Sequence, residues 1–434
     1  MIGITAMAMT ACNIGAKYTV GGTLTGLTGS GLVLEDNSGN SLELGSNGTF
    51  AFSSSLSNGD SYSVTVETQP STPAQTCTVQ NGSGTIDRAD VSNVLVTCKQ
   101  VGRFAFVSNQ LSNSISVYAI DASSGALVAV SGSPFAAAGN NPGALTVDPD
   151  GRFLYVVYTG SDEVQAFAID QTTGALTAAG SPTFTGSAPD AVVVDPTDTY
   201  LYVANLAANS ISAYSIDSTT GLPTQLAGSP LPVGSQPAAL QMDPSGGFLY
   251  LAEFGAANVV VLAIDSGTGA LTGITGSPFT SGQGPISIAV YPTGAYAYVA
   301  NETGKSISVY AVNSSSGALS QVSGSPVATS STPLGAVVDP GGRYLYAANA
   351  SSNAISVYSI APTSGALTLS VSAVAAGTLP TALAIDPSGQ FLYAVNAQSG
   401  DVSAYTVDAT TGTLTPVAGA PFAAGDQPHS IAID

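Results

Sequence analysis

The chain has 434 residues, of which only 8% are charged: 7 are Lys or Arg and 27 are Asp or Glu, so the formal net charge is −20. A surface this anionic repels phosphate groups, which excludes nucleic-acid binding and a polybasic membrane patch. Hydrophobic residues make up 44% of the chain, enough for a large core, and this excludes general disorder.

The first residues are apolar and small and lead into a cysteine. Residues 9–12 read Met-Thr-Ala-Cys, which is similar to the end of a bacterial lipoprotein signal, where the cysteine is lipidated after cleavage. No Lys or Arg precedes it and the apolar stretch is short, so the true translation start and an unmodified Cys12 both stay open. We expect residues 1–16 to be a signal remnant and linker, with membrane contact only through a lipid at Cys12.

Residues 17–99 alternate apolar and polar side chains in short runs that are separated by Asn-Gly and Ser-Gly turns. This pattern predicts a small antiparallel β-sandwich, which resembles the Ig-like modules in front of exported bacterial propellers. Cys77 and Cys98 both lie in β-like stretches. A disulfide between them would contribute roughly 3 kcal/mol and would need an oxidising compartment, whereas the alternative is two reduced core cysteines. We expect an extracytoplasmic bacterial protein, either periplasmic, anchored to the outer membrane, or at the cell surface or secreted.

From residue 101 to residue 434 the chain consists of seven repeats. The first aromatic residue of the repeated phrase recurs every 47 to 49 residues, at Phe104, Phe153, Tyr200, Phe248, Tyr296, Tyr344 and Phe391. Each unit contains four short strands, which is typical of a propeller blade. The first blade lacks its first strand, and only residues 430–433 can supply it. The sequence therefore predicts an all-β fold with a seven-bladed β-propeller closed by the C-terminal strand.

Two sets of repeated side chains invite a functional interpretation. Tyrosines recur in the second and third strands of nearly every unit, and Asp recurs before Pro and at the ends of third strands. Because they recur so regularly, we expect the tyrosines to pack neighbouring sheets rather than to stack a ligand. We expect the Asp side chains to accept hydrogen bonds from backbone N–H groups in turns.

The phrase Tyr-Val-Ala-Asn at residues 298–301, with its near copies, resembles the YVTN-repeat propellers. These belong to a wider group of seven-bladed lactonase-like proteins that includes 6-phosphogluconolactonase. The resemblance covers residues 101–434 and implies the propeller fold. It leaves catalysis open, because that group mixes hydrolases with proteins of no known activity.

A site in a repeat protein is expected where the repeat is broken. One face of the propeller carries the loops before the first strands and the loops between the second and third strands. We call it the upper face. Among the residues that directly follow the repeated prolines, the two that depart from the repeat are Asp190 and His429. Among the residues that end the second strands, the two that depart from it are Tyr158 and Glu253. His429 is the chain's only His, so His429 and Glu253 are the candidate general-base pair. The candidate ligand-binding residues are Tyr158, Asp190 and Lys305.

Carboxylates of this face also suggest a metal site. Asp162 and Glu163, together with Asp190 and Glu253, would offer oxygen ligands of the kind that Ca²⁺ prefers. No Asp-x-Asp-x-Asp-Gly loop is present, so calcium is the one cofactor that the sequence leaves open.

These features support two functions of different classes. The uniform blades and the weakly charged surface favour an exported, surface-associated scaffold without catalysis, which binds an extracellular protein or glycan or assembles with itself. The alternative is a lactonase-like hydrolase of a neutral lactone or ester that uses the upper face of the channel. A phosphorylated sugar lactone is disfavoured, because Lys305 would be the only cation among several carboxylates.

Overall fold

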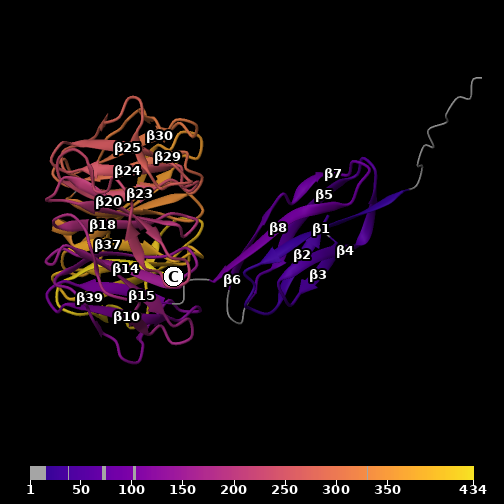
Figure 1. The fold of residues 1–434 in the computed structure, drawn as a ribbon, viewed down its shortest axis with the longest axis horizontal. Coiled ribbons are helices and arrows are strands. Elements are labelled where there is room, and N and C mark those ends of the chain that lie inside the picture. The colour runs from indigo at the N-terminus through magenta and orange to yellow at the C-terminus, as the bar shows by residue number, and fades with distance from the viewer. Residues whose placement is uncertain (1–15, 38, 71–74, 101–103, 330) are drawn as a thin grey trace, which may run out of the picture. The chain divides into compact units, whose positions relative to one another are not determined.

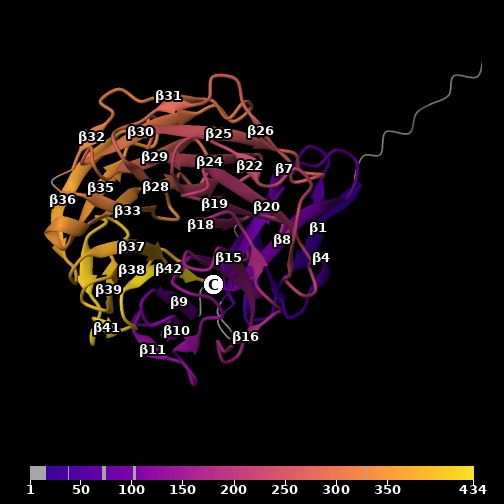
Figure 2. The same cartoon turned by 60° about the vertical axis from the view of Figure 1, so that its left-hand side comes forward.

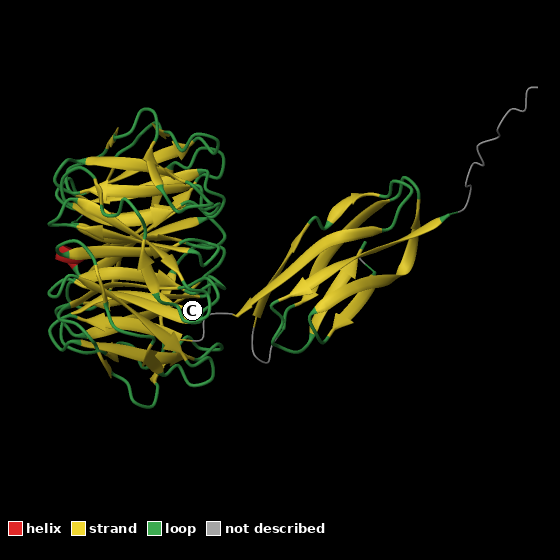
Figure 3. Cartoon of the chain, viewed as in Figure 1, coloured by secondary structure: helices red, strands yellow, loops and turns green. Residues whose placement is uncertain are grey.

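The computed structural model describes residues 16–37, 39–70, 75–100, 104–329 and 331–434. The chain divides into two compact units, Met1–Val101 and Gly102–Asp434. Strands dominate both units, and one short 3-10 helix, η1 (Ala350–Ser352), is the only helix in the described ranges (Figure 3). No helix found there is long and apolar enough to cross a membrane. The predicted lipidation site, Cys12, lies outside the described residues.

The first unit is built from two four-stranded sheets that share one core. One sheet has the order β4-β1-β8-β6 and the other has the order β3-β2-β5-β7, and β1 and β8 run parallel. Both sheets contribute buried side chains to the core, such as Phe52 and Val96 from the first and Leu34 and Val64 from the second. The strands are β1 (Lys17–Thr25), β2 (Leu32–Asp36), β3 (Asn40–Leu44), β4 (Gly48–Ser57), β5 (Ser61–Thr68), β6 (Gln75–Gln80), β7 (Ser83–Thr85) and β8 (Val91–Gln100).

The predicted disulfide is present in this unit. Cys77 on β6 and Cys98 on β8 are directly opposite each other in the antiparallel ladder, and their sulfur atoms are bonded. Both side chains belong to the core that the two sheets share. The bond closes a loop whose ends are 21 residues apart, which corresponds to roughly 3 kcal/mol of stabilisation.

The second unit is a seven-bladed β-propeller, in which seven sheets surround a central channel (Figures 1 and 2). The innermost strands are β13 (Pro142–Val147), β18 (Pro189–Val194), β23 (Pro237–Met242), β28 (Pro285–Val290), β33 (Pro333–Val338), β37 (Pro380–Ile385) and β42 (Pro428–Ile433). The second strands are β9 (Phe104–Asn109), β14 (Phe153–Tyr158), β19 (Tyr200–Asn205), β24 (Phe248–Glu253), β29 (Tyr296–Asn301), β34 (Tyr344–Asn349) and β38 (Phe391–Asn396). The third strands are β10 (Ser114–Ile120), β15 (Glu163–Ile169), β20 (Ser210–Ile216), β25 (Asn258–Ile264), β30 (Ser306–Val312), β35 (Ala354–Ile360) and β39 (Asp401–Val407).

The outer edge is divided into two short strands in all blades but one. In six blades it consists of a three-residue strand and a two-residue strand that both pair with the third strand. These are β11 (Leu127–Ala129) with β12 (Phe135–Ala136), β16 (Leu176–Ala178) with β17 (Thr183–Phe184), β21 (Pro223–Gln225) with β22 (Leu231–Pro232), β26 (Leu271–Gly273) with β27 (Phe279–Thr280), β31 (Leu319–Gln321) with β32 (Val327–Ala328), and β40 (Leu414–Pro416) with β41 (Phe422–Ala423). In the sixth blade a single strand, β36 (Leu367–Ala375), replaces them.

The first blade is completed by the C-terminus, as the repeat pattern predicts. The last strand, β42, pairs antiparallel with β9, so residues more than 300 positions apart share one sheet (Figure 2). Ile431 of β42 is buried in the core between the seventh and first blades. Because the two ends of the repeat array pair with each other, β9 is not left as an unpaired edge and the ring is closed.

The recurrent tyrosines connect neighbouring blades, as expected. In the second strands, the hydroxyl of Tyr155 donates to the carbonyl of Gly221 in the next blade at 2.9 Å, and Tyr202 does the same to Gly269. In the third strands, Tyr214 donates to the carbonyl of Phe184 in the preceding blade at 2.8 Å. These side chains are buried, so the aromatic array is a packing device rather than a ligand platform.

The repeated Asp side chains stabilise turns. Before the second strands, Asp148 accepts a hydrogen bond from the backbone N–H of Phe153 at 2.8 Å, and Asp386 accepts one from Phe391 at 2.7 Å. After the third strands, hydrogen bonds from Ser123 and Ser124 lower the pKa of Asp121 to about 2. Both sets of carboxylates are therefore occupied with local backbone and side-chain donors.

Candidate active site

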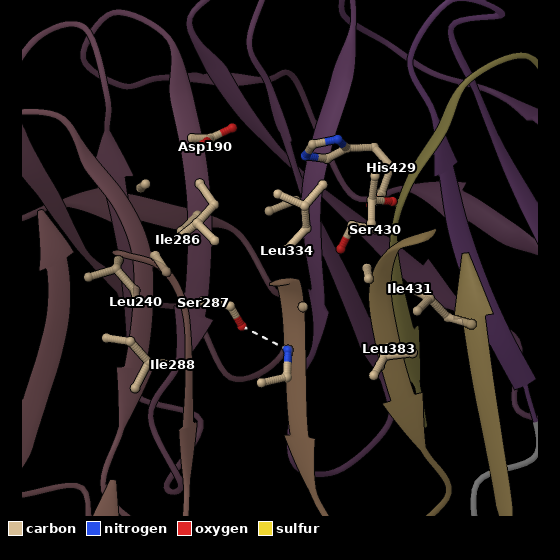
Figure 4. Close-up of a pocket in the computed structure, with 18 of the residues that line it drawn as sticks. Asp190, Leu240, Ile286, Ser287, Ile288, Leu334, Leu383, His429, Ser430 and Ile431 are labelled. Atoms are coloured by element: carbon tan, nitrogen blue, oxygen red, sulfur yellow. Dashed lines mark hydrogen bonds between the residues drawn. The ribbon is translucent and has the colours of Figure 1, made fainter. Parts of the chain in front are cut away.

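A cavity of about 370 Å³ lies in the central channel of the propeller (Figure 4). Six of its polar or small lining residues matter most for chemistry: Asp190, Ser287, Glu302, Thr381, His429 and Ser430. Most of the remaining lining is Ala, Val, Leu and Ile from the seven innermost strands. Glu302 comes instead from the loop after β29, which is one of the loops between second and third strands that were assigned to the upper face.

A β-bulge at the start of each innermost strand sets the direction of the key side chains. In β42, Pro428 pairs with Asn109 and Ser430 pairs with Ser108, so His429 is an extra residue without a partner in the ladder. The same irregularity follows the first proline of all seven innermost strands. An extra residue of this kind is released from the regular alternation of the strand, which allows its side chain to turn into the channel.

His429 and Asp190 approach each other across one blade. They occupy the same bulged position in the first and third blades, and β13 of the second blade contacts both of their strands. The residue at the bulged position of β13 is Gly143, which has no side chain to separate them. Figure 4 shows the carboxylate and the imidazole at the same level of the channel. Thr381 of the seventh blade donates to the backbone carbonyl of His429 at 3.2 Å.

The two groups influence each other's protonation. Burial lowers the pKa of His429 below its ordinary value, and the neighbouring Asp190 partly opposes this shift. Burial raises the pKa of Asp190, and the neighbouring His429 partly opposes that shift. The imidazole is therefore neutral near pH 7 and able to accept a proton, while the carboxyl group beside it favours the protonated ring that results.

The structure does not bring Glu253 into the site, so the predicted pairing of His429 with Glu253 is wrong. Glu253 is only 2% exposed and does not line the cavity. It stands where Asn205 stands in the preceding blade, and Asn205 accepts a hydrogen bond from the N–H of Gly186. Burial raises the pKa of Glu253, and the N–H of Gly234 lowers it through the equivalent hydrogen bond. Glu253 therefore holds a loop in place.

Tyr158, predicted to bind a ligand, has the same structural role. Its side chain is fully buried, and its hydroxyl accepts a hydrogen bond from the N–H of Ala138 at 3.3 Å. Burial also raises its pKa to about 12. Tyr158 occupies the position of the conserved-looking Asn in its own blade and does not reach the cavity. Two of the four outliers in the repeat are therefore alternative solutions to one hydrogen-bonding problem.

The remaining predicted residues lie outside the cavity lining. Lys305 is exposed in the loop after β29 and has a left-handed backbone, with φ of 46°. Asp162 has the equivalent position in the second blade and accepts a hydrogen bond from the N–H of Ala188 at 2.7 Å, as Asn209 does from Gln236. Glu163 is half-buried at the start of β15. Within the described ranges, no three His, Cys, Asp or Glu side chains are grouped so that they could hold a metal ion.

The repeat pattern identifies Asp190 and His429 as outliers but does not by itself show that they are neighbours in the channel. Ring closure puts the last strand of the chain two blades from β18. The proximity of Asp190 and His429 could therefore have been predicted from the topology. The glycine at position 143 was the second signal, because it is the smallest residue at any bulged position. Glu302 was a loop residue without a distinguishing pattern, and only its position identifies it.

The sequence matches one protein family in its propeller portion and in part of the first unit. The family is described as "Lactonase, 7-bladed beta-propeller", and the match covers residues 61–189 and 232–429, well over half of the chain. A search among curated proteins gave no match.

Solved structures share the fold at low sequence identity. A periplasmic gluconolactonase from Pseudomonas aeruginosa is 20% identical, with a TM-score of 0.67, covering 77% of this chain and 99% of its own. A candidate 6-phosphogluconolactonase from Bacteroides fragilis is 21% identical, with a TM-score of 0.68, covering 76% of this chain and 97% of its own. A protein from Lactobacillus plantarum is 22% identical, with a TM-score of 0.65, covering 77% and 100%.

These comparisons correct the leading functional prediction. The uniform blades and low surface charge favoured a scaffold without catalysis, but the match to the lactonase family supports the hydrolase alternative instead. The prediction failed because most of each blade is occupied by packing and turn residues, whose regularity carries no information about the few side chains that line the channel.

Proposed function

Because this chain belongs to the lactonase family of seven-bladed β-propellers, we propose that it hydrolyses neutral lactones in its central channel. The observation that carries the proposal is that His429 and Asp190 occupy bulged positions in the lining of one cavity of about 370 Å³ and are close enough for each to shift the pKa of the other. This volume lies within the range of small-molecule sites.

The chemistry follows from the two side chains. Neutral His429 removes a proton from a water molecule as the oxygen of that water attacks the carbonyl carbon of the lactone. Asp190 stabilises the imidazolium that forms. The bond between the carbonyl carbon and the ring oxygen then breaks, and the imidazolium returns its proton to the departing alkoxide. The product is an open-chain hydroxy acid, which loses a proton to the solvent at neutral pH.

The charge of the cavity favours an uncharged substrate. Asp190 and Glu302 both line it, and no Lys or Arg is among the lining residues that the structure describes. Arg152 and Arg343 lie in turns before second strands and form ion pairs there with Asp148 and Asp339. A phosphate group would therefore meet carboxylates without the cationic hydrogen-bond donors that normally hold it.

This contrast gives the direct test of the proposal. We expect the purified protein to hydrolyse δ-valerolactone in a saturable manner, measured as proton release above the spontaneous rate. We expect 6-phosphogluconolactone to be hydrolysed only at its spontaneous rate under the same conditions. Absence of any saturable hydrolysis across a panel of neutral lactones would refute the function, whereas a saturable rate with the phosphorylated lactone would refute the electrostatic argument.

The pH dependence should reveal the pairing of Asp190 with His429. His429 must be neutral to act as a base, and burial lowers its pKa, so the rate should fall only below about pH 6.5. In Asp190→Asn the charge that raises the His429 pKa is lost, so this acidic limb should move to lower pH. The maximal rate should fall roughly tenfold or more, because the imidazolium loses its stabilising neighbour.

A matched carboxylate substitution provides the control. Asp217 accepts hydrogen bonds from the N–H groups of Thr219 and Thr220 in an exposed turn, and Asn313 makes the same contacts two blades further on. Asp217→Asn should therefore leave both the rate and the pH profile unchanged. A fall in rate in Asp190→Asn with an unshifted acidic limb would indicate that Asp190 only supports the fold.

We also propose that the protein works outside the cytoplasm. The disulfide between Cys77 and Cys98 supports this location, because such bonds persist in oxidising compartments.

A further inference from the structure

The wall of the channel is divided into a polar arc and an apolar arc. At the bulged positions, Thr381, His429 and Asp190 belong to the seventh, first and third blades. Ala238, Ile286 and Leu334 occupy the same positions in the fourth, fifth and sixth blades. The innermost strands contact one another in this order around the ring. The apolar arc therefore faces the polar arc across the cavity (Figure 4).

The cavity continues as an apolar surface below this level. Two residues further along their strands, Leu240, Ile288 and Ile431 line the same cavity, and Figure 4 shows them beneath the bulged positions. Two of the neighbouring hydroxyl groups are already engaged. Ser287 accepts a hydrogen bond from the N–H of Ala336 at 3.2 Å, and Thr381 donates to the carbonyl of His429. The polar side chains that remain for the hydroxyls of a ligand are Asp190, His429 and Ser430 on the polar arc, together with Glu302 from the loop after β29 of the fifth blade.

From this division we infer that the substrate is a neutral lactone that carries an apolar substituent, such as an alkyl chain, and that Ile286 and Leu334 determine this specificity. The inference rests on the proposed function, because it places the carbonyl group beside His429. The alkyl chain then extends across the cavity to the apolar arc and the surface below it.

Energetics favour this class over a polyhydroxylated lactone of similar size. Each methylene group that leaves water for an apolar surface improves binding by about fourfold. A hydroxyl group that loses its water without a new partner weakens binding instead, by at least a comparable factor. Because binding of the alkyl chain is retained in the transition state, the gain should appear in kcat/KM.

The test compares lactones that share one ring but differ in their substituent. We expect kcat/KM to rise by about fourfold per methylene from δ-valerolactone to its δ-propyl and δ-pentyl derivatives, up to the length that the cavity holds. In Leu334→Asn, which preserves the approximate size of the side chain, the ratio of kcat/KM for the longest chain to kcat/KM for δ-valerolactone should fall at least tenfold. Leu369→Asn, on the outer strand β36 where Leu369 is 49% exposed, is the matched control.

Lactams with the same substituents resist hydrolysis and report binding alone, by isothermal titration calorimetry. Affinity that increases with chain length and is lost in Leu334→Asn supports the inference, even if no lactone is hydrolysed, in which case only the proposed reaction fails. Hydrolysis of lactones without any dependence on chain length, or with glucono-δ-lactone preferred over the alkyl derivatives, would overturn the inference while leaving the reaction intact. A dependence that persists unchanged in Leu334→Asn and Ile286→Thr would overturn the assignment of these residues.

Discussion

Replacing His429 with alanine is expected to lower kcat/KM for a neutral lactone by about 10²- to 10⁴-fold, the usual contribution of a general base. The fold should survive, because Thr381 contacts the backbone carbonyl of His429 rather than its ring, and alanine keeps that carbonyl. Rates are measured by proton release, and thermal unfolding is compared with that of the parent protein. A melting temperature close to that of the parent would show that the loss is chemical.

A second measurement distinguishes the loss of a proton-transferring group from a change in the shape of the cavity. Removing the ring leaves space in the cavity, so added imidazole should restore part of the rate in His429→Ala and have little effect on the parent. Asp217→Asn is again the control for substitutions outside the channel. A His429→Ala protein that hydrolyses lactones at the parental rate would mean that another group in the cavity lining, such as Glu302, supplies the base.

Deleting residues 427–434 is expected to abolish cooperative unfolding of the propeller. The deletion removes β42, which is the innermost strand of the first blade, and so exposes the edge of β9 and uncovers the core to which Ile431 belongs. The loss of a whole buried strand exceeds the marginal stability of a typical domain. Calorimetry should show no sharp transition, and size-exclusion chromatography should show aggregates, because an open apolar edge pairs with other chains.

A less severe variant tests the same closure. Ala432 lies in the middle of β42 opposite Phe106, and proline there cannot donate to the ladder. Ala432→Pro should therefore lower the melting temperature markedly, and a synthetic peptide of residues 427–434 should partly rescue the deletion. A deletion protein that unfolds like the parent would show that the ring is held closed without its last strand.

The architecture could be predicted from the sequence because the same pattern of strands and turns recurs in seven blades. Most strands have seven copies, so an atypical residue in one copy does not obscure the pattern. The offset between the two repeated phrases leaves β42 as the only candidate for the strand that pairs with the inner side of β9. The bulged positions were also identifiable, since they follow a recurring proline. The roles of Tyr158 and Glu253, at the ends of second strands, could not be identified from the sequence. Glu253 accepts from Gly234 as Asn205 does from Gly186, while Tyr158 accepts from Ala138, one residue before the equivalent glycine, and side-chain type alone does not reveal this.

The pairing of Asp190 with His429 was missed for a different reason. The two residues are 239 positions apart, and their proximity depends on ring closure together with the missing side chain at Gly143. Residue type alone favours Glu253 as the partner of His429, because it has a carboxylate, although its place in the ring does not bring it into the cavity. Knowledge of which strands border the channel, combined with the bulge, would have selected Asp190.

The bulge at the start of every innermost strand separates binding from folding. Each extra residue takes no part in strand pairing, and the ladder on either side of it is complete. Seven side chains can therefore change without disturbing the hydrogen bonds that hold the blades together. A propeller of this design is in effect an adaptable receptor: new ligand preferences can arise by substitutions at the residues after the seven prolines, at little cost to the stability of the ring that carries them.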